Sequence, residues 1–307
     1  MIITSCILSL LCSQQTTAEF AGKIDFDVSD KDVEFRRLRL GVEGHLDETF
    51  SYVFSVNNDI EKPDTSLHEI LIAFDSEWGA FEVGYFKEPF GLENSHSSHL
   101  VNFLERSPAT KLAADHSIGF ANYFAVDERS HLSWGIYRNS ITARFTNLLI
   151  GDEGVENFWH IGSSVAVRKS DEIFQGDDIL LFDFESLYQH GAFTAQIEAQ
   201  SLLIDESESS SFTAQMAYML NGENHGYSMS KARFNAPESG GGTELAVRGT
   251  HVDMVEYTPG IAVIDDYAFA TTYYLNDSSK LQFEIGYGSD GFSDDETTFA
   301  LRYHLRW

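Results

Sequence analysis

Cysteine is almost absent from this sequence, and the two that occur, Cys6 and Cys12, both lie within the first 18 residues. Residues 19–307 contain no cysteine, which excludes a small secreted fold held together by disulfide bonds. A chain of 307 residues with 43% hydrophobic content is long and apolar enough to fold by burying apolar surface. The same composition excludes a disordered chain.

Positive charge is also scarce, because 20 Lys and Arg stand against 48 Asp and Glu, a formal net charge of -28. Phosphate binding needs an excess of cationic side chains, so this balance argues against a nucleic-acid partner and against any other polyanion. Many acids fall between the predicted strands, for example Asp152, Asp171 and Asp294. Acidic connections at a solvated surface explain the net charge without fixing the charge of the interior.

Long apolar runs are missing too: none after the N-terminal segment reaches the roughly 20 residues that a membrane helix needs. The N-terminal segment combines an uncharged apolar stretch, Ile2–Leu11, with a polar run that ends in the small residue Ala18. This pattern is typical of a secretory signal peptide, residues 1–18, followed by a single domain over 19–307. Acylation of Cys12 is disfavoured, because Leu11 is bulky where that cleavage prefers a small residue.

What the sequence does contain is strict alternation of apolar and polar residues. Near the C-terminus, Leu281, Phe283 and Ile285 share one face of an extended chain, while Gln282 and Glu284 share the other. A period of two predicts β-strands, and similar runs recur along the whole chain between turn-forming segments. Helix is almost absent from this interpretation.

The alternation predicts sixteen strands. They span 19–28, 33–46, 48–58, 66–75, 78–86, 116–127, 130–138, 141–149, 157–169, 178–190, 192–204, 210–221, 243–256, 264–276, 279–290 and 296–307. An even number of strands, each close to the roughly 9 to 11 residues that cross a bilayer at a tilt, is typical of an outer-membrane barrel.

The apolar faces of these strands can point into the core of a soluble sandwich or outward into lipid. Aromatic residues near the predicted strand ends, Trp78, Trp159, Tyr267 and Trp307, suit the interfacial girdle of a membrane barrel. Together with the secretion signal they favour an all-β, antiparallel transmembrane barrel. Six residues are predicted to face lipid: Leu38, Leu40, Phe54, Phe283, Ile285 and Leu301.

Several stretches resemble the phosphate-selective porin O and P family. They are Phe35–Leu46 (FRRLRLGVEGHL), Val83–Ser107 (VGYFKEPFGLENSHSSHLVNFLERS), His116–Ala121 (HSIGFA) and parts of Met216–Met254. The resemblance implies a homotrimeric channel of 16 strands in the outer membrane of a Gram-negative bacterium, surrounded by lipid and lipopolysaccharide. It implies passive diffusion of small hydrophilic solutes or ions, with phosphate as a candidate, and neither an enzymatic activity nor a cofactor.

The same resemblance implies that the third extracellular loop folds inward and constricts the pore. Residues 87–115 follow the fifth strand and take that place if the N-terminus is periplasmic. Pro89 and Gly91 break the strand where the chain must leave the wall. Apolar residues can hold the loop on the barrel interior: Phe90, Leu92, Leu100, Val101, Phe103 and Leu104. Its charges are then expected in the constriction: Lys87, Glu88, Glu93, Glu105, Arg106 and Lys111.

The polar faces of the strands supply the remaining predicted lining of the pore. By strand parity it consists of Arg37, Arg39, Glu43, Glu69, Arg144, Arg168, Arg248, Arg302 and Arg306. Because a few groups at a constriction outweigh screened charges at the mouths, these arginines predict a mild preference for anions despite the acidic composition.

Two alternative interpretations of the motifs remain. The run His-Ser-Ser-His at 96–99 suggests a metal site or a histidine beside a nucleophilic serine, but metal sites need three or four ligands of defined geometry. No G-x-S-x-G elbow and no phosphate-binding glycine loop accompanies it. The alternative function is an outer-membrane enzyme acting on lipids, which needs Ser, His and an acid on the outer face. The histidines placed on strands are predicted to face the lumen: His45, His160 and His304.

Residues 222–242 do not fit the pattern. By parity they form a periplasmic connection, where short turns are expected. Either the strand count is wrong here or the segment folds against the barrel. In the second case Lys231 and Arg233, beside Phe234, are expected to line the vestibule.

Overall fold

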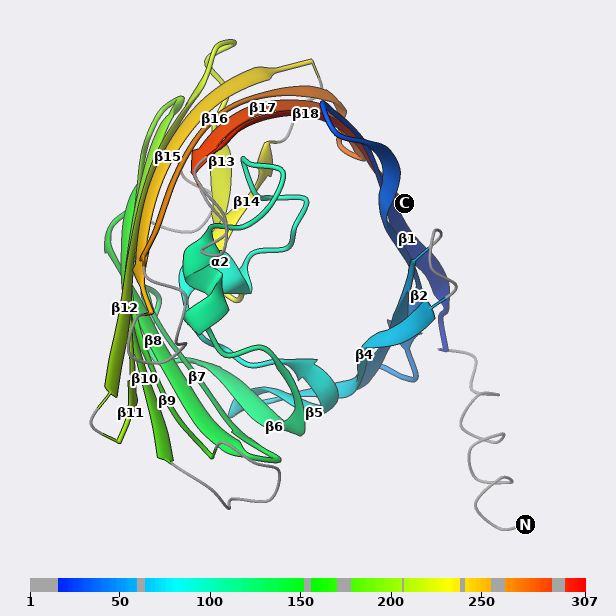
Figure 1. The fold of residues 1–307 in the computed structure, drawn as a ribbon. Helices are drawn as coiled ribbons and strands as arrows, with labels where there is room; N and C mark the ends of the chain where they lie inside the picture. Colours follow the sequence, from blue (N-terminus) through cyan, green and yellow to red (C-terminus); the bar gives the residue numbers. More distant parts are fainter. Residues whose placement is uncertain are drawn as a thin grey trace.

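A computed structural model of the chain describes residues 16–59, 64–151, 156–169, 178–205, 207–237, 241–254, 263–288 and 296–307. Sixteen strands close into one antiparallel barrel, in which β1 pairs with β18 and β12 pairs with β15 (Figure 1). The predicted leader lies outside the described residues up to position 15, as do the connections that hold Asp152, Asp171 and Asp294. Among the described residues no helix is long and apolar enough to cross a membrane.

The wall strands have these bounds: β1 Glu19–Ser29, β2 Val33–His45, β3 Phe50–Asp59, β4 Asp64–Ser76, β5 Gly79–Lys87, β6 His116–Ala125, β7 Ser130–Tyr137, β8 Ser140–Ile150, β9 Asn157–Lys169, β10 Asp178–His190, β11 Phe193–Ile204, β12 Ser207–Met219, β15 Thr243–Asp253, β16 Val263–Asn276, β17 Ser279–Gly288 and β18 Glu296–Arg306. Each predicted strand is confirmed, and its ends differ from the prediction by at most three residues. The fold class is therefore the one that the alternation predicted.

Four short elements stand apart from the wall. The β5–β6 connection holds the helix α2 (Leu92–Ser95) and the 3₁₀ helix η1 (Pro108–Leu112). The β12–β15 connection holds β13 (His225–Ser228) and β14 (Arg233–Pro237), which pair only with each other in a two-stranded sheet. Figure 1 shows both connections inside the ring of wall strands.

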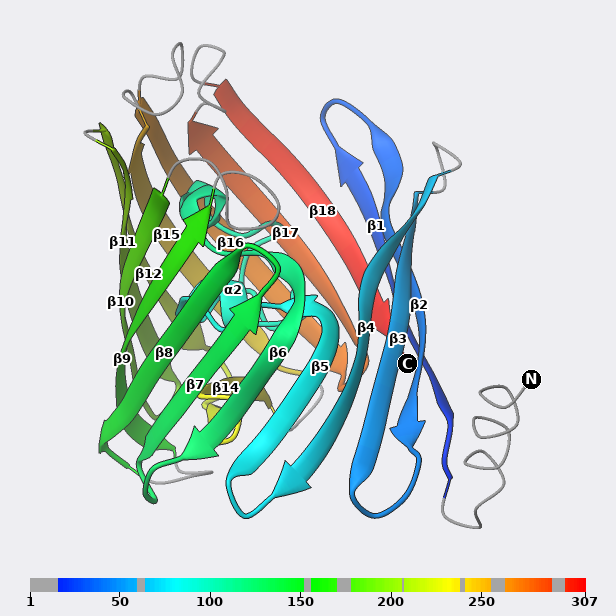
Figure 2. The ribbon, with the colours of Figure 1, turned by 90° about the horizontal axis from the view of Figure 1, so that it is seen from below.

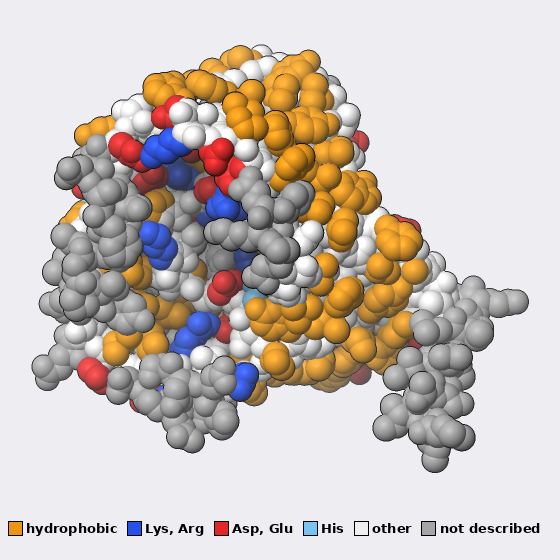
Figure 3. All heavy atoms as spheres, turned by 45° about the vertical axis from the view of Figure 1, so that its right-hand side comes forward, with side chains coloured by type: hydrophobic (Ala, Val, Ile, Leu, Met, Phe, Trp, Pro, Cys, Tyr) orange, Lys and Arg blue, Asp and Glu red, His pale blue; other side chains and the backbone are white. Residues whose placement is uncertain are grey.

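The outer face of the wall is apolar. Leu40, Phe54 and Leu301 are 46%, 44% and 43% exposed, whereas the inward residues Ser55 and Arg302 are almost completely buried. Figure 3 shows the apolar side chains as a broad belt on the outside, with charged groups gathered around the hollow at one end. A continuous apolar exterior around a polar interior is the arrangement of a barrel that faces lipid.

The barrel closes between its first and last strands. Their register runs from Lys23 opposite Arg306 to Ser29 opposite Ala300. The strands cross the wall at a tilt (Figure 2), as closure of a sheet into a barrel requires. Among the described residues, every wall strand is therefore paired with a neighbour on both sides, and the wall has no open edge.

Most of the apolar core lies inside the barrel against one side, and a smaller cluster of Leu71, Phe86, Ala121 and Tyr137 lies on β4 to β7. Residues of the β5–β6 connection pack on inward-facing residues of β8 to β12, β15 and β16 in three clusters. The connection contributes Phe90, Ala109, Leu112, Ala114, Leu92, Leu100, Val101 and Phe103. Along β2 to β5 the inward side chains are mostly half-buried instead. The inner surface therefore has a covered side and an uncovered side.

Candidate pore and its constriction

The β5–β6 connection is attached to the wall at its first residue. The Glu88 carboxylate accepts hydrogen bonds from Ser140 at 2.7 Å, Thr142 at 2.5 Å and Arg168 at 2.7 Å. Charge-assisted bonds to a buried carboxylate are strong and fix the start of the connection on β8 and β9. The Glu88 carboxylate is buried among these partners, and the residue also borders a cavity of the lumen. Arg168 is half-buried and acts as its counter-ion.

The helix α2 begins on a carboxylate of the covered wall. The main-chain N–H groups of Leu92 and Glu93 donate to the two carboxylate oxygens of Glu198 in β11, at 3.1 and 2.9 Å. This arrangement satisfies amide groups that have no partner within the helix. Gly91 precedes it with φ of 68°, and a Cβ there would collide with the Glu198 carboxylate. Glycine is required at this position, where the sequence also predicted a break in the strand.

The connection also binds itself. The Glu93 carboxylate accepts hydrogen bonds from the main-chain N–H of Ser107 at 2.9 Å and from its hydroxyl at 2.5 Å. Arg106 donates to the carbonyl oxygens of Glu93 at 3.1 Å and His96 at 2.6 Å. Glu93 is buried by these contacts rather than exposed in the lumen. The Glu93 carboxylate therefore stabilises the inward segment by joining the helix α2 to Ser107.

A hairpin of β13 and β14 enters the lumen from the opposite end of the barrel. The neighbouring connections at that end are short, as 46–49 and 77–78 illustrate, whereas β12 and β15 are separated by residues 220–242. Of the two possibilities raised by the sequence, the second holds, because this segment folds inside the barrel and the strand count is right.

Wall residues of three strands hold the hairpin. Nδ1 of His160 in β9 lies 2.6 Å from the Tyr227 hydroxyl, and Nε2 of Gln189 in β10 donates to the carbonyl oxygen of His225 at 2.5 Å. Arg144 in β8 donates to the carbonyl oxygen of Ala232 at 3.0 Å. These bonds are buried, which makes each of them costly to break.

The hairpin and the β5–β6 connection meet in the middle of the lumen. Arg233 donates a hydrogen bond of 2.5 Å to the carbonyl oxygen of Ser95. The Phe234 ring is buried with Leu92 and Leu100 and lies 4.4 Å from the His96 ring. The two segments therefore form one body that covers the wall from β8 to β16.

Three arginines predicted to line the pore lie beneath that body. Arg144, Arg248 and Arg302 point inward but are at most 6% exposed. Arg144 pairs with Glu185 at 2.6 Å, and Arg248 pairs with Asp266 at 3.1 Å. Strand parity gave their direction correctly. The inward segments cover Arg248 and Arg302, whereas Arg144, although nearly buried, also borders a cavity between the wall and the hairpin.

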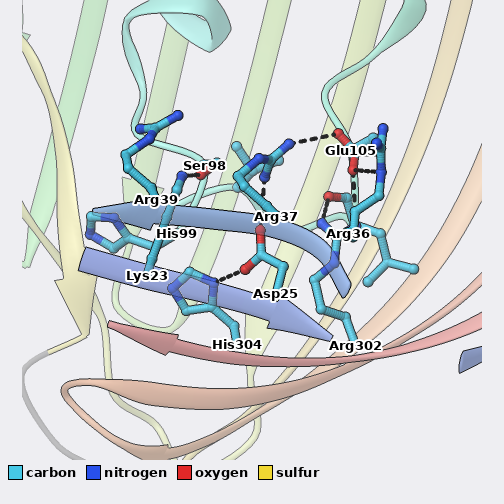
Figure 4. Close-up of polar contacts among 12 residues, drawn as sticks. Lys23, Asp25, Arg36, Arg37, Arg39, Ser98, His99, Glu105, Arg302 and His304 are labelled. Atoms are coloured by element: carbon cyan, nitrogen blue, oxygen red, sulfur yellow. Dashed lines mark hydrogen bonds and ion pairs between the residues drawn. The ribbon is translucent and has the colours of Figure 1, made fainter. Parts of the chain in front are cut away.

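Glu105 of the β5–β6 connection lies among arginines of β2 and β18 (Figure 4). Its carboxylate lies 2.9 Å from Nη2 of Arg302, 3.3 Å from Nε of Arg36 and 3.5 Å from Nη2 of Arg37. Burial alone would raise the pKa of Glu105, but the three guanidinium groups hold that pKa below its ordinary value. The carboxylate is therefore ionised and its charge is compensated.

Beside this cluster lies an ion-pair chain on the first two strands. Asp25 accepts a hydrogen bond from Arg37 at 2.8 Å and a second one from the His304 ring (Figure 4). Further along the same wall Arg39 donates to Asn57 at 2.9 Å, and Lys23 donates to the Ser98 hydroxyl. The uncovered wall thus carries a row of cations.

Two cavities lie along the uncovered side. The first, about 510 Å³, follows β1 to β4 and β18 and is lined by Lys23, Arg39, Glu43, Glu69, Lys231 and Arg306. The second, about 390 Å³, follows β4 to β8 and is lined by Glu69, Glu82, Lys87, Lys231 and Arg233. Seven predicted site residues therefore border these cavities: Arg39, Glu43, Glu69, Lys87, Glu88, Arg144 and Arg306. Lys111 is exposed on η1, on the covered side.

The histidines of the His-Ser-Ser-His run have separate surroundings. His96 is buried against Phe234, whereas His99 contacts the Ser97 hydroxyl at 2.9 Å and the Arg306 guanidinium. Burial and the neighbouring Arg306 lower the pKa of His99 to about 2, so its ring is neutral. Across the described parts of the chain, no three His, Cys, Asp or Glu side chains are grouped to hold a metal ion.

Sequence reasoning left several members of the site out of the predicted lining. Lys23 and Asp25 follow from the alternation of the first strand, since they oppose Phe26. Lys231 and Arg233 lie in the unexpectedly long connection, whose length was the available signal. No local pattern indicates that this connection turns inward.

The model of one protein family, phosphate-selective porin O and P, matches residues 15–181, which is more than half of the chain. The chain belongs to this family. It is therefore an outer-membrane porin, a channel protein of the Gram-negative outer membrane, as the resemblance of its motifs predicted. A search of curated proteins found no significant match.

Solved structures share the fold of the porin at low sequence identity. An anion-selective porin from Comamonas acidovorans is 10% identical with a TM-score of 0.64, and the match covers 95% of this chain and 99% of that one. OmpF of Salmonella typhi in complex with daunomycin is 7% identical with a TM-score of 0.65, covering 95% and 98%. OmpT, an outer membrane protein of Vibrio cholerae in trimer form, is 12% identical with a TM-score of 0.59, covering 96% and 100%. At these identities the matches establish the barrel fold.

Proposed function

We propose that this porin is a passive, mildly anion-preferring channel whose solute path runs along the uncovered wall of β1 to β5. The β5–β6 connection is the third extracellular loop and forms the constriction, with the N-terminus on the periplasmic side. Arg37, Arg39 and Glu105 are the charged groups that a solute meets there. Neither catalysis nor a cofactor has a part in this function.

The observation that carries the proposal is the row of cations on the uncovered wall. Arg37, Arg39 and Arg306 lie on β2 and β18, and Arg39 and Arg306 line the first cavity. Lys23 on β1 also lines it but is buried against Ser98. Charges on low-dielectric walls of a narrow passage act strongly on a passing ion, while distant surface charges are screened within roughly 8 to 10 Å. The acidic composition therefore governs the mouths and the cation row governs the passage.

The acids on the same wall set the strength of the preference. Asp25 and Glu105 are paired with arginines and contribute little net field. Glu43 and Glu69 line the first cavity together with the cations and oppose them. A passage of mixed charge admits phosphate among other small anions without being built for it alone, since tight recognition of phosphate uses several converging donors.

The outer surface supports the proposed setting. The apolar belt matches a surrounding of outer-membrane lipid and lipopolysaccharide. A homotrimer is the proposed assembly, in keeping with the trimer form of the structurally similar OmpT.

An enzyme acting on lipids would need a hydroxyl nucleophile, a histidine and an acid near the membrane interface. His160 and His304 point into the barrel instead, where their partners are Tyr227, Glu185 and Asp25. Both histidines have structural partners on the inner side, which supports a channel without catalysis.

Reversal potentials across a planar bilayer in a potassium chloride gradient test the proposal. The native channel should pass chloride in preference to potassium, and replacing Arg37 and Arg39 with serine should weaken that preference. The same replacement at Arg129, which is exposed in the β6–β7 turn, is the control and should leave it unchanged. Cation selectivity of the native channel would overturn the proposal.

A further inference from the structure

The tip of the hairpin separates the two cavities of the uncovered side. Lys231 lies in the turn between β13 and β14 and lines both cavities. Glu69, on the wall strand β4, is the other charged residue that lines both. The boundary between the cavities is therefore set by one cation from the hairpin and one acid from the wall.

From this placement we infer that Lys231 is a further selectivity-determining residue of the pore. It lies at a second charged constriction, which the hairpin forms in series with the constriction at Glu105. The inference rests on the proposed function, because it assumes that solutes use the uncovered side. The inference adds a residue of the β12–β15 connection, which enters from the opposite end of the barrel, to the groups that determine selectivity. Small anions are the solutes that this residue favours.

The hairpin is built to hold a charge at a fixed point. Its base is tied by His225, whose Nε2 lies 2.8 Å from Glu244, and its tip is tied by Arg144 through the carbonyl oxygen of Ala232. Tyr227 and Phe234 pack against the wall and the β5–β6 connection between these points. Lys231 is exposed next to the buried Ala232, on a hairpin that is held by the buried Tyr227 and Phe234.

The charges around Lys231 define what it does to a solute. Two charged groups act on Lys231: Arg233 on the same hairpin, which has the same sign, and Glu43 on β2, which has the opposite sign. On one side the first cavity adds Lys23, Arg39 and Arg306, and on the other the second adds Lys87. An anion that leaves the row on β1 and β2 meets Lys231 before it reaches Lys87, whereas Glu69 is the group that retains cations. Replacing the lysine by an acid leaves Glu69 unopposed at the boundary.

The first experiment measures reversal potentials of Lys231→Glu and Lys31→Glu channels in the potassium chloride gradient. Lys31 is exposed in the β1–β2 turn at the other end of the barrel. Its substitution changes the net charge of the protein by the same amount as Lys231→Glu does. We expect about threefold or greater loss of chloride-over-potassium preference for Lys231→Glu and no change for Lys31→Glu, because only the constricted charge acts on the ion. Equal effects of the two substitutions would overturn the inference.

A second experiment sets the charge after folding, so that misassembly cannot imitate the result. Cys6 and Cys12 are replaced by serine, and Lys231→Cys then carries the only thiol of the chain. Modification with a cationic methanethiosulfonate should restore the chloride preference, and an anionic reagent should lower it further. Both reagents should react faster from the end at which the hairpin enters. Absence of any change after complete modification contradicts the inference.

The two proposals fail in different ways. If the native channel prefers cations, the proposed function is wrong and the role of Lys231 falls with it. If the native channel prefers anions and Arg37→Ser with Arg39→Ser weakens that preference, while the charge at position 231 has no effect, only the second constriction is wrong.

Discussion

Arg233 and Ser95 join two segments that enter the barrel from opposite ends: Nη1 of the arginine donates a hydrogen bond of 2.5 Å to the serine carbonyl oxygen. The β5–β6 connection packs on β8 to β12, β15 and β16, and the hairpin adds to this packing at β8 to β10. Together the two segments form a packed core on one side of the interior. The first prediction concerns the packing at this junction.

Replacing Phe234 with alanine should separate the two segments. The ring is buried between the His96 and His225 rings at 4.4 and 4.7 Å, and its loss from a packed site costs about 3 to 5 kcal/mol. We expect a larger and noisier single-channel current, because both segments gain freedom in the lumen. Asn235→Ala, at an exposed position on the same hairpin, should leave the current steady. Identical recordings from the two variants would contradict the proposed junction.

Replacing Arg144 with methionine should destabilise the whole assembly. Glu185 would remain buried without its partner at 2.6 Å, and breaking a buried pair in this way costs about 3 to 5 kcal/mol. The temperature at which the barrel loses its compact, heat-modifiable form in detergent measures the effect. A second variant, Arg144→Met with Glu185→Gln, should recover part of the loss because no uncompensated charge is left. No recovery would show that the charge of Glu185 is not the cause.

The lipid-facing side of β17 provides a test of the membrane orientation. Phe283, near the middle of the strand, faces outward and is 40% exposed, and Tyr287 faces the same way close to the end of the strand. Arginine at the midplane of a barrel costs about 2 to 4 kcal/mol, falling to about 0 to 1 near the interface. Phe283→Arg should therefore reduce assembly in lipid vesicles far more than Tyr287→Arg. An equal reduction would place the bilayer elsewhere on the strand.

The base of the hairpin should loosen as the pH rises. Burial by itself lowers the pKa of His225, and the charge of Lys280 acts in the same direction. The Glu244 carboxylate at 2.8 Å and the Asn235 carbonyl oxygen outweigh both and raise this pKa above its ordinary value. A raised pKa contributes stability that is complete below the ordinary value and is lost as the pH rises through the shifted one. The stabilisation is therefore present in mild acid and absent in alkaline solution.

Current noise in mild acid and in alkaline solution measures this effect, since a loosened hairpin fluctuates in the passage. Native channels should become noisier as the pH rises. His225→Gln keeps the shape and the hydrogen-bonding capacity of the side chain but does not titrate in this range. A pH dependence of the noise that persists unchanged in this variant rules out His225 as its origin.

The strands were predictable because their signal is local. Whether Leu40 and Arg39 lie on opposite faces depends only on alternation, and the outward Leu40 and inward Arg39 confirm it. The break at Gly91 was likewise predictable from residue type, since few other residues tolerate its backbone geometry.

What surrounds an inward side chain was not predictable. Arg144 and Arg39 look alike in the sequence, each within an alternating strand. Arg144 is 3% exposed beneath the carbonyl oxygen of Ala232, whereas Arg39 is only half-buried and lines the first cavity. The difference is decided by contacts between residues far apart in the chain, which leave no local pattern. The acidic composition likewise did not indicate the charge of the passage, because composition does not record which residues meet in the folded chain.

The pairing of β1 with β18 has a consequence for how the molecule is made. The bonds of this seam join residues from the two ends of the wall, such as Val28 and Leu301. Every other pair joins strands that follow one another in the wall, whereas the seam can form only when both ends of the wall are in place. Until then two long edges with unpaired amide and carbonyl groups are available to any extended chain, the usual origin of aggregation in sheet proteins. The time for which the seam stays open therefore governs the yield of correctly assembled channels.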